Sequence, residues 1–141
     1  MLMPDVNVLV YAHREETRLH KRYADWLIAL AQGPEPFAIS ELVLHRFLRV
    51  ATNPRIFDPP STAAQALRFI DALLERPACC LIRPGPQHWD IFRRLCEDRG
   101  LQGKIVADAV HAAVAIENGC EWVTADTDFA RFAPPLRWRH L

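Results

Sequence analysis

The sequence predicts an α/β fold in which helices cover both faces of a parallel sheet. Short apolar segments alternate with longer amphipathic segments, and this alternation is typical of parallel strands joined by helical crossovers. Of the 141 residues, 50% are hydrophobic and 24% are charged, which is the composition of an ordinary globular domain. A chain of this length buries about 70% of its unfolded surface on folding. We therefore expect a single domain spanning residues 1–141.

The first half of the chain is expected to contain two strands and three helices. Pro4 has no N–H to donate to a neighbouring strand, but the apolar residues around it still favour a short strand. Ser40 is expected to cap the helix after the second strand. The expected elements are a strand at Leu2–Asp5, helices at Val6–Ala12 and Leu19–Ala31, a strand at Phe37–Ile39 and a helix from Ser40 to Thr52.

The second half is expected to contain three helices and three strands. Gly100 and Gly119 each follow an amphipathic or apolar segment, and glycine is typical just after the last turn of a helix. The expected elements are helices at Thr62–Leu74, Gln87–Arg99 and Lys104–Asn118, and strands at Cys79–Ile82, Glu121–Thr124 and Leu136–Trp138.

Acidic residues follow three of the predicted strands. Asp5 ends the first strand, Glu41 follows the second, and Asp126 follows the strand Glu121–Thr124. Ligands of such sheets bind outside the carboxyl ends of the strands, so we expect these carboxylates to share a site. Asp5 and Asp126 each have an alternative role as the cap of a following helix or turn, and Asp128 competes with Asp126 for either role.

Asp108 lies within the predicted helix KIVADAVHAAVAIEN, which is apolar on nearly every face. An ionised carboxylate in a buried helix is costly unless it is paired or bound to a metal. A metal site and a buried salt bridge with an arginine both account for this residue. His111 is three residues further on, and we interpret it as a histidine of the core or its rim.

Glu41 has two interpretations. As the first residue after Ser40, its negative charge favours the helix dipole by about 0.3–1 kcal/mol. However, His45 and Arg49 follow at intervals of four residues, so a polar stripe runs along an otherwise apolar helix. Such a stripe favours a cleft, and we keep Glu41 as a candidate catalytic acid.

Several converging carboxylates predict a divalent cation. Like charges raise the pKa of one another, and a bound cation relieves that repulsion. Mg²⁺ prefers oxygen ligands, with Mn²⁺ expected to substitute for it. The four cysteines have no CxxC spacing, which argues against zinc.

Charge does not by itself identify a nucleic-acid partner, because 17 basic residues balance 17 acidic ones. Local contacts would be needed, and Arg49 and Arg55 are the best candidates for RNA contacts because they flank the helix of Glu41. Charged residues occur too early for a signal peptide, and no apolar run reaches the roughly 18 residues of a membrane span. We expect a cytoplasmic protein with no membrane partner.

The ordered set of motifs resembles a known family. DVNVL at residues 5–9 resembles the opening of PIN domains, and DAVHAAVA at 108–115 followed by TADTDF at 124–129 resembles their closing half. SELVL at 40–44 with FLRVATNPRIF at 47–57 is similar to a branch of VapC toxins, from bacterial VapBC toxin–antitoxin pairs. The resemblance spans nearly the whole chain.

The resemblance implies a three-layer α/β/α sandwich with Mg²⁺-dependent endoribonuclease activity on structured RNA, such as tRNA or ribosomal RNA. It also implies a cognate VapB-type antitoxin and a homodimer. Carried over by position, Asp5 and Asp108 become the metal ligands, Asp126 completes the acidic pocket and orients or deprotonates the attacking water, and Asn7 and Thr124 support them.

One departure from the family concerns the second acid. Many PIN domains have it about one helical turn after Glu41, where this chain has His45 and Arg46. Two other functions compete with a nuclease. A PIN fold used only for binding is one. A receiver-like phosphoacceptor is the other, but it needs a lysine after a late strand, and the only lysines are Lys21 and Lys104.

Overall fold

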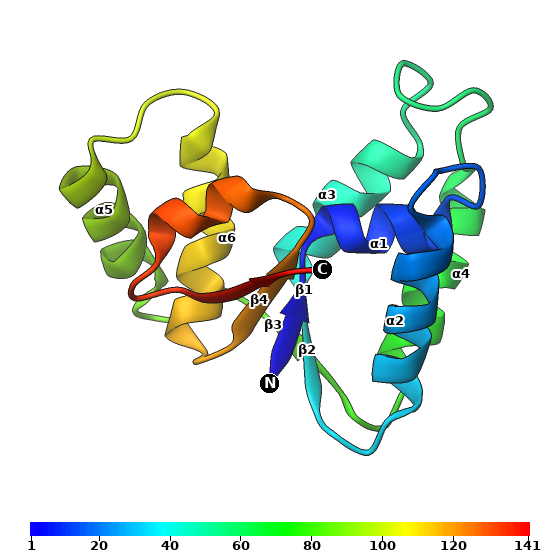
Figure 1. Cartoon of the computed structure of the whole chain (residues 1–141), viewed down its shortest axis with the longest axis horizontal. Coiled ribbons are helices and arrows are strands. Elements are labelled where there is room, and N and C mark those ends of the chain that lie inside the picture. Colours follow the sequence, from blue (N-terminus) through cyan, green and yellow to red (C-terminus); the bar gives the residue numbers. More distant parts are fainter.

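In the computed structural model, which describes residues 1–141, a five-stranded sheet lies between two layers of helices (Figure 1). Every neighbouring pair of strands is parallel, and the strand order is β3-β2-β1-β4-β5. The predicted α/β fold, a three-layer sandwich, is therefore confirmed. The strands are β1 (Leu2–Pro4), β2 (Phe37–Ser40), β3 (Cys79–Ile82), β4 (Glu121–Thr124) and β5 (Arg137–His140).

The helices divide between the two faces of the sheet, with α1 to α4 on one side and α5 and α6 on the other (Figure 1). A 3-10 helix, η1, connects β4 to β5 beside α6. The bounds are α1 (Val6–His13), α2 (His20–Gln32), α3 (Glu41–Ala51), α4 (Ala63–Leu74), α5 (His88–Arg99), α6 (Ile105–Glu117) and η1 (Thr127–Phe132). Sequence reasoning expected only a short turn in place of η1.

The short strand β1 occupies the centre of the sheet. Leu2 is in register with Phe37 of β2 on one side and with Glu121 of β4 on the other. Pro4 is tolerated here because its pairing continues only with β4, opposite Val123, while the pairing with β2 stops at Leu2. The carboxyl ends of β1 and β4 therefore lie side by side.

Helix caps differ between α3 and α4. Thr62 and Gln65 form a capping box at the start of α4, with distances of 3.1 Å from Gln65 N to Thr62 Oγ1 and 2.9 Å from Thr62 N to Gln65 Oε1. Ser40 precedes α3 as expected, but its side chain makes no capping hydrogen bond, and its buried Oγ has no partner. Ser40 is therefore the N-cap residue of α3 as predicted, but its side chain does not contribute to the cap.

All helices are too short or too polar to cross a lipid bilayer.

Candidate functional site

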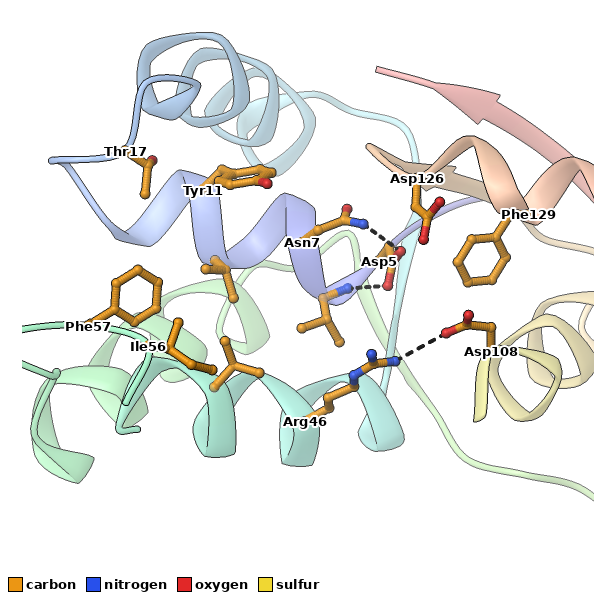
Figure 2. A pocket seen from close by; sticks show the side chains of 13 residues that line it. Asp5, Asn7, Tyr11, Thr17, Arg46, Ile56, Phe57, Asp108, Asp126 and Phe129 are labelled. Carbon is orange, nitrogen blue, oxygen red and sulfur yellow. Dashed lines mark hydrogen bonds and ion pairs between the residues drawn. The ribbon is translucent and has the colours of Figure 1, made fainter. Parts of the chain in front are cut away.

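A cavity of about 410 Å³ opens at the carboxyl ends of β1 and β4 (Figure 2). Three carboxylates line it: Asp5 directly after β1, Asp126 directly after β4, and Asp108 from the first turn of α6. The structure thus brings together three of the four acids that the sequence predicted. Asp5 is more than 100 residues from the other two in the chain, and it lies near Asp126 because β1 and β4 are neighbours in the sheet.

Asp5 is fixed by three hydrogen bonds. Its Oδ1 accepts from Val6 N at 2.6 Å, and its Oδ2 accepts from Thr124 Oγ1 at 2.6 Å and from Asn7 Nδ2 at 2.9 Å. The bond from Val6 caps α1, so Asp5 is both the N-cap residue of α1 and part of the cavity lining. Only 4% of the residue is exposed, and this burial raises its pKa from 3.8 to about 6 despite the hydrogen bonds.

The hydroxyl of Thr124 connects two of the acids. It donates to Asp5 Oδ2 and accepts from Asp126 N at 3.0 Å and from Asn7 Nδ2 at 3.1 Å. Asn7 Oδ1 also accepts from Ala125 N at 3.0 Å, which ties the start of α1 to the end of β4. Asn7 and Thr124 therefore hold Asp5 in one orientation.

Asp108 faces an arginine that sequence reasoning had not assigned to the site. Arg46 Nη1 lies 3.5 Å from Asp108 Oδ1, and both side chains line the cavity (Figure 2). Burial raises the pKa of Asp108, while the positive charge of Arg46 opposes that rise. The arginine partner considered for Asp108 thus exists, but it lies inside the cavity and makes a single long contact. A hint was available, because Arg46 interrupts an apolar run between Leu44 and Phe47.

Asp126 and Asp128 have different positions. Asp126 Oδ1 accepts from Asp128 N at 2.8 Å and so caps η1, while the same residue lines the cavity. Asp128 is exposed and does not line it. Of the two residues, Asp126 is therefore the one that caps η1 and lines the cavity.

Glu41 and the two candidate RNA-binding arginines lie outside the cavity lining. Glu41 is the first residue of α3, and its Oε2 lies 2.5 Å from Arg83 Nε in an ion pair at the protein surface. Arg49 and Arg55 are exposed and form no ion pair within the chain. The roles of these three residues stay predictions.

His111 is buried, as interpreted from the sequence. Its ring stacks on Trp122 with 5.9 Å between ring centres, and its Nδ1 has no hydrogen-bond partner. Burial lowers the pKa of His111 to about 4, and the nearby charge of Arg46 contributes to that shift. The ring is therefore neutral at physiological pH.

The three carboxylates retain oxygen positions for a cation. An ionised carboxylate offers about four lone-pair positions, and Asp5 uses three of them. Asp126 accepts one hydrogen bond and Asp108 only the long contact from Arg46. No three His, Cys, Asp or Glu side chains come close enough to share one ion directly. Mg²⁺ needs only one or two direct carboxylate ligands, because it keeps several waters in its coordination sphere, and carboxylate oxygens of this kind fit it.

Comparison with known proteins identifies the family. A family model described as "PIN domain" matches residues 2–134, which rules out the receiver-like alternative. The chain is 48% identical to ribonuclease VapC43 of Mycobacterium tuberculosis over 99% of this chain and 95% of the relative, and 40% identical to ribonuclease VapC31 of the same organism over 96% and 100%. A solved complex of VapBC2 from Rickettsia felis with a promoter DNA fragment has a TM-score of 0.72 at 23% identity, covering 99% of this chain and 97% of that one. The chain belongs to the PIN domain family and, within it, to the VapC ribonucleases.

Proposed function

We propose that this protein is a Mg²⁺-dependent endoribonuclease and the toxin of a type II toxin–antitoxin pair. The observation that carries the proposal is the cavity in which Asp5, Asp108 and Asp126 converge beside Arg46. The likeness to ribonucleases VapC43 and VapC31 supports RNA as the substrate. Structured RNA, such as tRNA or ribosomal RNA, is the proposed substrate class, and this rests on the family resemblance.

The proposed reaction is hydrolysis of a phosphodiester bond. When bound to Asp5 and Asp108, Mg²⁺ or Mn²⁺ would polarise a phosphoryl oxygen and acidify a nearby water. Asp126 is more exposed than the other two acids and can accept the proton of the attacking water. The water oxygen bonds to phosphorus, the bond from phosphorus to the ribose oxygen breaks, and that oxygen takes up a proton from solvent. Asn7 and Thr124 keep Asp5 in place throughout.

Arg46 is proposed to contact the scissile phosphate. The charged residues lining the cavity are three aspartates and one arginine, which sum to a formal charge of −2 when all are ionised. One divalent cation would neutralise this charge. A guanidinium has five N–H donors, and Arg46 uses one of them in a 3.5 Å contact, so it can turn towards a phosphate oxygen.

Glu41 is kept as the proposed fourth acid, and Arg83 offers a matched control. We expect Glu41→Gln to lower the rate of RNA cleavage by at least about 10²-fold, the usual contribution of a positioned acid or base. Arg83→Gln removes only the ion-pair partner of Glu41, and it should leave the rate within a few-fold. The measurement is the single-turnover rate with excess Mg²⁺. Equal rate losses in both variants would show that Glu41 acts through the ion pair, and a normal rate in Glu41→Gln would remove it from the site.

Metal dependence tests the proposed function directly. We expect Mg²⁺ or Mn²⁺ to support cleavage and EDTA to stop it, while Ca²⁺ should bind but support little turnover because it tolerates looser geometry. The measurement is cleavage of single-stranded and structured RNA by purified protein. Cleavage that persists in EDTA would exclude the mechanism. RNA binding without cleavage under every metal would favour the alternative of a PIN fold used only for binding.

A VapB-type antitoxin and a second copy of the chain are the proposed protein partners, in the cytoplasm. An apolar groove of about 210 Å³ between α2 and α4 is lined by Leu27, Ile28, Phe69 and Leu73, and Ile28 is 52% exposed. An amphipathic antitoxin segment could cover this surface. The solved VapBC2 complex supports a toxin–antitoxin assembly. Light scattering that gives a purely monomeric mass at micromolar concentration would contradict the dimer.

A further inference from the structure

The cavity that holds the acids extends well beyond them. Its carboxylates gather at one end, while the other end is lined by Tyr11, Thr17, Ile56 and Phe57 (Figure 2). We call these four residues the apolar arm. A site for one cation and one phosphate needs no such extension, yet the whole cavity of about 410 Å³ falls within the range of roughly 300–1,000 Å³ of small-molecule sites. The apolar arm therefore has room for a further chemical group of the ligand.

We propose that the apolar arm binds a nucleobase of the RNA next to the cleaved phosphodiester bond, with Phe57 and Ile56 as its contact surface. The proposal rests on the proposed function, because it places the phosphate at the acidic end. A nucleobase has two apolar faces and stacks on aromatic side chains without requiring a particular sequence. RNA-binding sites commonly hold unstacked bases in this way.

The arm is built to keep its shape. The guanidinium of Arg14 lies 4.3 Å from the ring centre of Phe57, and only 11% of the Arg14 side chain is exposed. Arg14 also donates to Pro59 O at 2.8 Å and to Ser61 Oγ at 3.0 Å, so it joins the end of α1 to the segment that carries Phe57. Arg14 thus covers one face of the Phe57 ring and fixes its position, and Phe57 also lines the cavity.

The side chain of Ile56 and the hydroxyl of Tyr11 are also suited to contact a nucleobase. Ile56 is 52% exposed and lines the cavity together with Phe57, so its side chain offers apolar surface to an occupant of the cavity. Tyr11 packs against Tyr23 with 5.2 Å between ring centres, but its hydroxyl has no hydrogen-bond partner within the chain. That hydroxyl can donate to or accept from the edge of a base, while the side chains of Ile56 and Phe57 cover its face.

The test combines arm variants with a modified RNA. The substrate is a short fluorescein-labelled RNA that the wild-type protein cuts at one mapped bond, and a second version lacks the base on one side of that bond. We expect Phe57→Ala to lower kcat/KM by about 10-fold on the complete RNA, mostly through KM, which lies within the range for loss of one base stack. Removing the base from the RNA should lower the kcat/KM of the wild-type protein by a similar factor. Combining Phe57→Ala with the RNA that lacks the base should lower kcat/KM little further.

Two further variants keep the test decisive. Ile56→Ala should show the same pattern and cannot damage the core, because the side chain is mostly exposed. Trp89→Ala removes an aromatic side chain that is 63% exposed on α5, outside the cavity lining, and should change nothing. The inference is overturned if the arm variants behave like Trp89→Ala. It is also overturned if the variant and the missing base lower kcat/KM independently, so that their factors multiply. A third contrary result is that the arm variants cut RNA normally and are only less inhibited by an antitoxin.

The test distinguishes failure of the nuclease proposal from failure of the base-binding proposal. If wild-type protein cuts no RNA with Mg²⁺ or Mn²⁺, the nuclease proposal fails. Wild type and Phe57→Ala are then each compared by fluorescence anisotropy on a short single-stranded RNA and on the same backbone without bases. A shared, non-additive loss of affinity would still support a base in the arm, and equal affinities would reject it.

Discussion

Asp5→Asn and Asp108→Asn are each expected to lower the rate of RNA cleavage by at least about 10²-fold with Mg²⁺ in excess, and to leave the fold intact. A cation held by these residues supplies several kcal/mol of charge stabilisation in the transition state, and each 1.36 kcal/mol is about tenfold in rate. Asparagine keeps the shape of aspartate and an oxygen for Thr124, but it cannot neutralise a cation. Single-turnover cleavage rates measure the effect.

Asp128→Asn is the matched control, because it removes a carboxylate that is close to Asp126 in the chain but does not line the cavity. We expect its rate to stay within a few-fold of wild type. Circular dichroism and thermal melting establish that each variant is folded. Full activity in Asp5→Asn or Asp108→Asn would remove that residue from the proposed metal site.

The second expected result is that His111→Phe stabilises the protein in mild acid relative to wild type. The pKa of His111 falls from 6.5 to about 4 on folding, chiefly because the ring is buried. As the pH falls from 6.5 towards 4, the unfolded chain binds a proton that the native protein excludes, so stability is lost across this window. At pH 5 the loss amounts to about 2 kcal/mol. Phenylalanine keeps an aromatic ring beside Trp122 and cannot be protonated.

The variant is compared with wild type at each pH because protonation of Asp5 changes the stability of the native state in the opposite direction to protonation of His111. Its pKa rises from 3.8 to about 6 on folding, so protonation below pH 6 favours the native state and partly hides the effect of His111. Melting temperatures of both proteins are measured from pH 8 to pH 4 in EDTA. We expect the variant to gain roughly 4–8 °C over wild type between pH 8 and pH 5. Parallel curves for the two proteins would contradict a depressed pKa at His111.

Local patterns in the sequence were enough to predict most of the fold. Each predicted helix or strand overlaps an observed one, and Cys79–Ile82 and Glu121–Thr124 have the observed bounds. Strand ends located Asp5 and Asp126, since carboxyl ends of parallel strands meet at one edge of a sheet. Burial inferred from an apolar helix located Asp108, which is 9% exposed.

Side-chain partners between distant elements were not predictable. Nothing near Glu41 in the chain indicates its ion pair with Arg83, which depends on how β2 and β3 align. The contact of Arg46 with Asp108 joins α3 to α6 across the cavity, and it likewise has no local signal. Ser40 shows the limit of a local rule, because its residue type and position favour a cap that the buried hydroxyl does not make.

The central position of β1 has a consequence for the order in which the protein is synthesised. Asp5 leaves the ribosome well before its partner Thr124, which belongs to β4 and lies 119 residues further along the chain. Until β4 has been made, the carboxylate of Asp5 lacks the hydroxyl that orients it. Domains generally fold as units once their strands are available. A nascent chain therefore has no assembled cavity at the sheet edge until β4 has been synthesised and paired with β1.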